Sequence, residues 1–183
     1  MRAGDLGYRA AVLDLSDTLQ AVEICRRWVD IRSKEGTTAP PAAGLRASVR
    51  VEVRARFSAE LFAGRYLKHG GRLFYINDAR DYTGKRAELL MSCDELVGLP
   101  ATLKASPAAS PVPCRAFLVH GVKRMGDGIA LNSYSTQLEA AVIEVGRPQP
   151  GAEFAVAGVA WRVTGLVEDD DDRIVRRMWV RRV

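Results

Sequence analysis

The segment from residue 49 to residue 57, VRVEVRARF, alternates between apolar and charged side chains. A period of two is typical of a β-strand that buries one face. The apolar face consists of Val49, Val51, Val53, Ala55 and Phe57. The pattern therefore predicts a strand whose opposite face carries three arginines and one glutamate.

Other segments have apolar or alternating runs of the length of a strand. They are residues 9–15, 26–32, 115–122, 128–132, 138–145 and 152–158. Residues 17–28, DTLQAVEICRRW, also suit a short helix with Asp17 as its N-cap, and the local pattern does not decide between helix and strand.

A hairpin pattern occurs twice in the chain, as GGRLFYINDARDYTGKRAELLMSCDEL at residues 70–96 and AGVAWRVTGLVEDDDDRIVRRMWVRR at residues 157–182. An offset of 87 residues places Gly71 on Gly158 and aligns similar residue types. The aligned pairs include Phe74 with Trp161, Ile76 with Val163, Asp81 with Glu168, Arg86 with Arg173, Met91 with Met178 and Cys93 with Val180. Two related β-domains explain this pattern, and chance similarity between amphipathic hairpins is the alternative. The segments RAAVLDL (9–15) and RAFLVHG (115–121) open the two halves in the same way.

The pattern predicts a mainly β protein with two small β-barrel or sandwich domains. The first domain covers residues 1–98 and includes a long loop at 33–45, which is rich in Pro and Ala. Residues 99–113 are also rich in Pro and Ala and are predicted to be a linker, and residues 114–183 form the second domain. The predicted core residues are Val51, Val53, Phe57, Phe74, Ile76, Leu89 and Met91 in the first domain, and Phe154, Val156, Trp161, Val163 and Met178 in the second.

Composition places the chain among globular proteins, with 48% hydrophobic and 27% charged residues. The net charge of +5 permits contact with a polyanion but does not require it. No apolar run reaches the ~20 residues that span a bilayer, and Asp5 and Asp14 interrupt the N-terminal segment, so a cytoplasmic site of synthesis is expected. The three cysteines have neither disulfide nor metal spacing.

Candidate catalytic chemistry is sparse. His69 and His120 are the only histidines, and neither has a Cys or His at metal-ligand spacing. The chain has no P-loop, dinucleotide-binding glycine motif or nucleophile elbow. The acidic run Glu168–Asp172 lacks the spacing of a calcium loop, and a solvated turn that faces an arginine-rich neighbour is expected. We therefore expect a protein that is not an enzyme and uses no cofactor.

The first half resembles the phage head–tail joining family, also called head-closure or stopper proteins, over roughly residues 8–97. The resemblance lies in an early tryptophan, Trp28, in a basic strand that leads to a glycine pair, and in the ending GRLFYINDARDYTGKRAELLMSCDE. The matching positions of that ending are Gly71, Phe74, Tyr75, Ile76, Asp78, Asp81, Gly84, Leu89, Met91, Cys93 and Glu95. The proline- and alanine-rich segment 33–45 and the attached second half depart from the single-domain pattern. The second half looks like a degenerate repeat of the same barrel.

The resemblance implies a structural connector of a tailed bacteriophage, located in the virion neck and assembled in the host cytoplasm. Such a protein forms a ring between portal or adaptor and tail, continues the DNA channel, helps retain packaged DNA and docks the tail. The implied partners are the portal or adaptor ring, a tail terminator or tail tube protein, copies of the chain itself and, without sequence specificity, double-stranded DNA. A tail terminator, a capsid decoration protein and a small OB-like nucleic-acid-binding module are the alternatives.

Charged residues near the long loop and in the second hairpin are the candidates for contact with the DNA channel or a neighbouring subunit. They are Lys34, Arg50, Arg54, Arg56, Asp169, Asp170, Arg176 and Arg177. Alternate residues of a strand lie about 6.6 Å apart, close to the spacing of phosphates along one DNA strand. We therefore expect loop 33–45 and the arginine face of the next strand to point towards the channel or a neighbouring ring.

Overall fold

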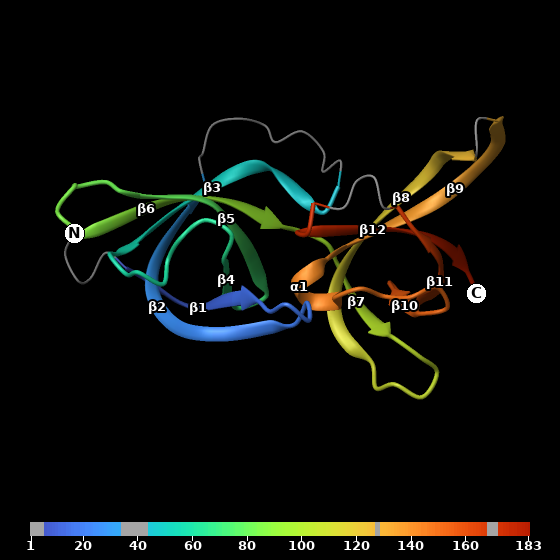
Figure 1. Cartoon of the computed structure of the whole chain (residues 1–183), viewed down its shortest axis with the longest axis horizontal. Helices are drawn as coiled ribbons and strands as arrows, with labels where there is room; N and C mark the ends of the chain where they lie inside the picture. Colours follow the sequence, from blue (N-terminus) through green and yellow to red (C-terminus); the bar gives the residue numbers. More distant parts are fainter. Residues whose placement is uncertain (1–5, 34–43, 127–128, 168–171) are drawn as a thin grey trace. The chain divides into compact units, whose positions relative to one another are not determined.

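The computed structural model describes residues 6–33, 44–126, 129–167 and 172–183. It divides into two compact units, Met1–Val97 and Gly98–Val183, and each unit contains a closed barrel of six antiparallel strands (Figure 1). The predicted fold class, mainly β with two small β-domains, is confirmed. In the part of the chain that is described, no helix is long and apolar enough to cross a membrane.

The first barrel has the strand order β1–β2–β3–β6–β5–β4, and pairing of β4 with β1 closes it. Its strands are β1 (Tyr8–Leu15), β2 (Ala21–Ser33), β3 (Arg46–Arg56), β4 (Tyr66–His69), β5 (Arg72–Asp81) and β6 (Glu88–Leu96). Alternate side chains point inward and form one apolar core, in which Phe74, Ile76 and Met91 are fully buried.

The second barrel has the strand order β10–β11–β12–β9–β8–β7, and β7 pairs with β10 to close it. Its elements are β7 (Leu99–Lys104), β8 (Val112–Gly126), β9 (Ile129–Ala141), α1 (Val142–Val145), β10 (Glu153–Val156), β11 (Val159–Leu166) and β12 (Val175–Arg182). Phe154, Leu138 and Met178 are fully buried in its core.

The two barrels share one topology, since β7 to β12 take the places of β1 to β6 in turn. The offset of 87 residues holds from β4 to β6 and from β10 to β12. Both barrels also have a β-bulge at the same position, because the pairing skips Asn77 in β5 and Thr164 in β11. The repeated hairpin in the sequence therefore reflects a repeated barrel.

The connection before the fourth strand repeats as well. Gly64 and Gly151 have φ values of 98° and 96°, a region that favours glycine. Their N–H groups donate to the carbonyl oxygens of Ile76 and Val163 over 2.9 and 2.8 Å. A side chain at either glycine would strain the backbone, so both barrels depend on glycine at this turn.

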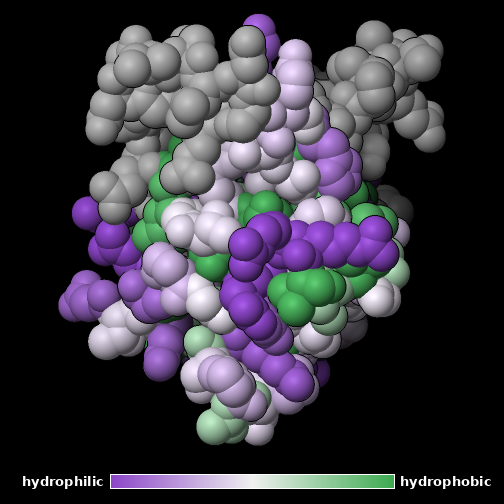
Figure 2. Space-filling model, turned by 90° about the vertical axis from the view of Figure 1, so that its right-hand side faces the viewer, coloured by the Kyte–Doolittle hydropathy of each residue, from purple (hydrophilic) through white to green (hydrophobic). Residues whose placement is uncertain are grey.

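The predicted core is correct except at its margins. Phe57 is 37% exposed, because β3 ends at Arg56 and the strand alternation no longer applies to the next residue. Trp161 faces the core but is only partly buried. Figure 2 shows one face of the molecule, where hydrophilic side chains cross between smaller hydrophobic areas.

The predicted linker at residues 99–113 is wrong, because β7 and the start of β8 lie within it. Prolines hide these strands from pattern analysis. Pro100 and Pro113 both lie where β7 pairs with β8. Pro100 comes before the residues of β7 that pair with β10, and Pro113 comes before the residues of β8 that pair with β9. Each proline therefore has a neighbouring strand on one side only, where a missing N–H group is tolerated. Only residues 105–111 form a loop here.

Two further sequence interpretations need correction. Residues 21–28 belong to β2, so the short helix proposed for residues 17–28 does not form. The segments RAAVLDL and RAFLVHG are not equivalent, because the first lies in β1 and the second in β8, which takes the place of β2. The true counterpart of β1 is β7, which the linker interpretation concealed.

Candidate functional site

An open groove of about 560 Å³ lies beside the end of β3 in the first barrel. It is lined by Leu6, Arg26, Arg27, Trp28, Arg56, Phe57 and Ser58. Trp28 is 55% exposed and Phe57 is 37% exposed, so two aromatic rings face solvent among three arginines. We call this surface the arginine–tryptophan groove.

Strand alternation places Trp28 on the outside of the barrel, because its neighbour Val29 is fully buried. Arg9 on β1 lies opposite Trp28 across the strand pair. On the other side, Val29 pairs with Ala55, which brings Arg56 next to Trp28 in the groove. Trp28 therefore lies between arginines of two neighbouring strands.

Two groove arginines lack a carboxylate partner among the described residues. Arg27 donates from Nε to the hydroxyl oxygen of Ser58 over 3.2 Å and forms no ion pair. Arg56 forms no ion pair either, including with Glu88, which lies opposite it on β6. Among the described residues, no carboxylate therefore neutralises the charge of these two arginines.

The other exposed arginines of the first barrel are largely neutralised. Arg26 forms a 2.7 Å ion pair with Glu23, and this hydrogen bond lowers the pKa of the Glu23 carboxyl. Similar pairs join Arg32 with Asp30, Arg54 with Glu52, Arg72 with Glu95 and Arg80 with Asp78. Among the described arginines of β2 and β3, only Arg27 and Arg56 therefore lack an ion pair.

The three arginines predicted on β3 do point outward, but they differ in surroundings. Arg54 is held by Glu52 at 2.9 Å, and hydrogen bonding to Glu52 raises the pKa of its guanidinium. Arg50 lies 3.9 Å from Asp94. Only Arg56 enters the groove, so the three do not form one uniform basic face.

Other predicted site residues separate into two groups. Lys34, Asp169 and Asp170 lie outside the described residues. Arg176 is only 5% exposed, at the place that Leu89 occupies in the first barrel, and Arg177 pairs with the buried Glu139 at 2.7 Å. Arg176 and Arg177 therefore contribute to the packing of the second barrel instead of forming an exposed cationic surface.

A second groove of about 560 Å³ lies over the β5 bulge and includes Asn77, Asp78, Arg50, Arg80 and Glu52. The Nδ2 atom of Asn77 is buried there without a hydrogen-bond partner. The surrounding charges are mixed, because Arg80 pairs with Asp78. This groove lacks the concentrated charge of the arginine–tryptophan groove.

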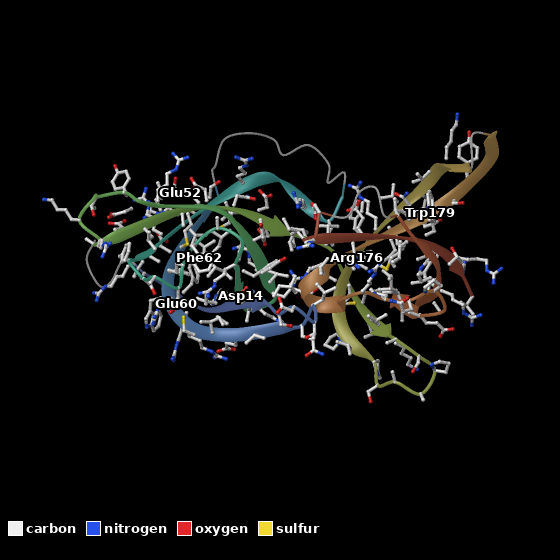
Figure 3. All side chains as sticks on the ribbon, in the orientation of Figure 1. Asp14, Glu52, Glu60, Phe62, Arg176 and Trp179 are labelled. Carbon is white, nitrogen blue, oxygen red and sulfur yellow. The ribbon has the colours of Figure 1, made fainter. Side chains whose placement is uncertain are left out.

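Arg65 forms an ion-pair cluster in the first barrel that has a structural role. Its guanidinium contacts Asp14 at 3.2 Å and Glu60 at 2.7 Å and lies 4.2 Å from the centre of the Phe62 ring (Figure 3). Its side chain is only 12% exposed. The cluster fixes the connection between β3 and β4 against β1.

The cysteines and histidines show no arrangement for nucleophilic catalysis. Burial raises the pKa of the Cys93 and Cys114 thiols to about 12, which keeps them protonated at neutral pH. His69 Nδ1 lies 3.1 Å from the Arg9 carbonyl oxygen, and His120 Nδ1 lies 3.1 Å from the Thr136 hydroxyl. In the described residues, no three His, Cys, Asp or Glu side chains gather as they would around a metal ion.

Sequence reasoning missed the groove because its residues come from separate elements. Trp28 was noted only as part of a family resemblance, and Arg27 was not singled out. Phe57 was assigned to the core. The available signal was the pair of arginines at positions 26 and 27 next to Trp28, but only the pairing of β2 with β3 adds Arg56.

Comparisons of the chain with protein-family models, with curated proteins and with solved structures find no match.

Proposed function

We propose that the chain is a structural head–tail connector of a tailed bacteriophage, which assembles as a ring at the neck of the virion. The observation that carries this proposal is the duplication of a closed barrel in which the second and third strands are joined differently: residues 34–45 connect β2 with β3, whereas β8 and β9 extend as a paired hairpin. Closed barrels have no free strand edge, so association must use their connections and outer faces. Duplication gives the chain two sets of connections and two outer barrel faces.

The connection in the second barrel supports a docking role. Residues Val122–Gly126 of β8 and Ile129–Ser135 of β9 pair with one another beyond the part of these strands that pairs with β7 and β12. Figure 1 shows this hairpin extending from the barrel. Isolated two-stranded ribbons are marginally stable, and Tyr134 on the ribbon is 70% exposed. A neighbouring protein that packs on the ribbon would stabilise it.

In the first barrel the corresponding connection is loop 33–45, most of which lies outside the described residues. The groove and Arg50 lie on the barrel that carries this loop. In a ring, one of these surfaces would contact a neighbouring subunit or DNA, and the exposed ribbon would contact the portal, adaptor or tail side. DNA contacts of this kind depend on phosphate charge rather than base sequence.

The proposal is tested by blocking expression of the chain in the phage that encodes it and examining the particles by electron microscopy. The expected result is normal capsids together with separate, complete tails, and heads that lose packaged DNA. Supplying the chain in trans should restore joined, infectious particles.

Other outcomes would contradict the proposal. Joined, genome-filled particles would exclude a connector, and tails of irregular length would favour a tail terminator. Joined particles with fragile capsids would favour a decoration protein. Absence of the chain from purified virions, together with tight binding of the purified chain to oligonucleotides, would favour the OB-like module.

A further inference from the structure

Exposed aliphatic side chains, which we call the aliphatic strip, precede the arginine–tryptophan groove on β2, and the ion-paired Arg26 separates them from Trp28. Val22 and Ile24 on this strand are 45% and 40% exposed, and Trp28 follows them. At the Trp28 end, Arg27 and Arg56 carry charge that no described carboxylate neutralises. The surface therefore suits a ligand that combines an aliphatic side chain with several carboxylates.

A nucleic acid fits this surface less well than an acidic peptide does. Binding along a phosphate backbone uses a track of available cations. Beyond the groove, Arg32 and Arg54 are already paired with Asp30 and Glu52. A phosphate backbone offers no apolar group to cover the exposed side chains of Val22 and Ile24, whereas an aliphatic side chain of a polypeptide can cover them.

The chain carries a complementary segment. Val167 is followed by the carboxylates Glu168–Asp172 in the connection between β11 and β12. The run Glu168–Asp171 lies outside the described residues. Asp172 accepts hydrogen bonds from the backbone N–H groups of Ile174 and Val175, which leaves the four carboxylates Glu168–Asp171 to match the two groove arginines that no described carboxylate neutralises. Val167 offers an aliphatic side chain beside them.

We infer that the arginine–tryptophan groove of one copy binds the acidic segment 167–172 of a second copy. The two surfaces differ, so the contact is heterologous and can repeat around a ring. The contact between two copies does not depend on the proposed connector function, and only its closure into a ring rests on that function. Single exposed ion pairs contribute little, so the contact is weak between two copies and gains strength when it repeats.

The first experiment measures binding of a peptide with the sequence of residues 164–174, TGLVEDDDDRI, to the full chain. The indole N–H resonance of Trp28, assigned with Trp28→Phe, is followed by NMR in ¹⁵N-labelled protein. We expect the peptide to shift the Trp28 resonance and to leave those of Trp161 and Trp179 unchanged. Raising the salt concentration should weaken binding, because the contact depends on exposed charges.

Matched variants locate the site. Arg27→Gln and Arg56→Gln should each weaken peptide binding at least fivefold, whereas Arg32→Gln, an exposed arginine already paired with Asp30, should leave it unchanged. A peptide with Gln and Asn in place of the five carboxylates should not bind. Equal loss in all three variants, or equal binding of the neutral peptide, would overturn the inference.

The second experiment tests association between copies by sedimentation. The wild-type chain should associate at high concentration, and neither the double variant Arg27→Glu/Arg56→Glu nor the double variant Asp169→Arg/Asp170→Arg should associate alone. Mixing the two variants should restore association, because the unchanged acidic segment of the groove variant can bind the unchanged groove of the acidic-segment variant. Association of either variant alone, or no rescue on mixing, would contradict the pairing.

Two further results would overturn the inference in identifiable ways. If Asp169→Asn/Asp170→Asn shifts the Trp28 resonance independently of protein concentration, the segment binds within its own chain. If a twelve-residue oligothymidylate shifts Trp28 at lower concentration than the peptide does, the groove is a nucleic-acid site. Neither result bears on the connector function, which is tested by electron microscopy of the phage particles. The groove contact and the connector function can therefore be disproved separately.

Discussion

The two barrels have the same strand order and the same bulge, yet they anchor the connection after their third strand in different ways. In the first barrel, Arg65 ties residues 57–65 to Asp14 on β1. In the second, Glu144 of α1 accepts hydrogen bonds from the backbone and guanidinium of Arg115 on β8, with distances of 2.9–3.1 Å. Barrel closure is thus retained while the polar contacts that support it change.

The outer surfaces differ more than the cores do. The first barrel has the arginine–tryptophan groove at the end of β3, whereas the second has a projecting ribbon and the acidic connection. A closed barrel requires inward apolar residues on every strand, but it places few demands on outward ones. Duplication therefore lets one copy acquire a basic and aromatic groove while the other acquires an acidic connection, with no change of fold.

The largest expected effect concerns the boundary between the barrels. A fragment of residues 98–183 should fold, whereas residues 114–183 should not, because the shorter fragment lacks β7 and leaves β10 and the start of β8 unpaired. Circular dichroism and the dispersion of amide NMR resonances provide the measurement. Equal folding of both fragments would show that β7 is dispensable and that the barrel is not closed.

Equivalent core positions should differ in their effect on stability. Phe74→Ala should lower the free energy of unfolding by about 3–5 kcal/mol, because the side chain is fully buried. Trp161→Ala, at the equivalent position, should cost at least about 1 kcal/mol less, since Trp161 is only partly buried and its buried Nε1 lacks a hydrogen-bond partner. Urea unfolding of both variants tests this order, and a larger loss for Trp161→Ala would reverse our comparison.

The buried cysteines offer a probe of each barrel. Cys93 lies in the first core and Cys114 in the second, and burial raises the pKa of each thiol to about 12. Only the thiolate reacts, so at pH 8 each should react about a thousandfold more slowly than a thiol of pKa 9.0. Mass spectrometry of alkylated protein measures this. Phe74→Ala should speed labelling of Cys93 more than that of Cys114, and rapid labelling of both in the native chain would contradict their burial.

The smallest expected effect lies in the β5–β6 turn. Asp81 accepts hydrogen bonds from the backbone N–H groups of Thr83, Gly84 and Arg86, of which the Arg86 contact is the largest cause of its lowered pKa. A carboxyl whose pKa is lower in the folded state stabilises the protein above its unfolded pKa, and this contribution is lost as the pH falls through the folded pKa.

Asp81→Asn should therefore have a slightly lower thermal midpoint than the wild type at pH 7. This difference between variant and wild type should disappear at the most acidic pH at which the protein stays folded. Thermal scans between pH 7 and pH 3 provide the measurement. Asp17 is exposed, and Asp17→Asn is the control variant, whose thermal midpoint should match that of the wild type at every pH. An equal deficit of Asp81→Asn at every pH would show that the turn depends on side-chain shape rather than on charge.

Local sequence patterns determined the strands and the repeat. The alternation of residues 49–57 predicted β3, and the offset of 87 residues aligned β4–β6 with β10–β12, including the positive φ values of Arg86 and Arg173. These features arise between neighbours in the chain, where side-chain alternation and tight turns follow from local chemistry.

Tertiary structure decided which strands close each barrel. The pairing of β7 with both β8 and β10 overrides the prolines that suggested a linker, and the pairing of β2 with β1 overrides the possible helix at residues 17–28. Closure also decided that Arg176 is buried and that Arg56 meets Trp28 across two strands. Such outcomes depend on partners distant in the sequence, and one strand's pattern of side chains does not specify which strand will lie beside it.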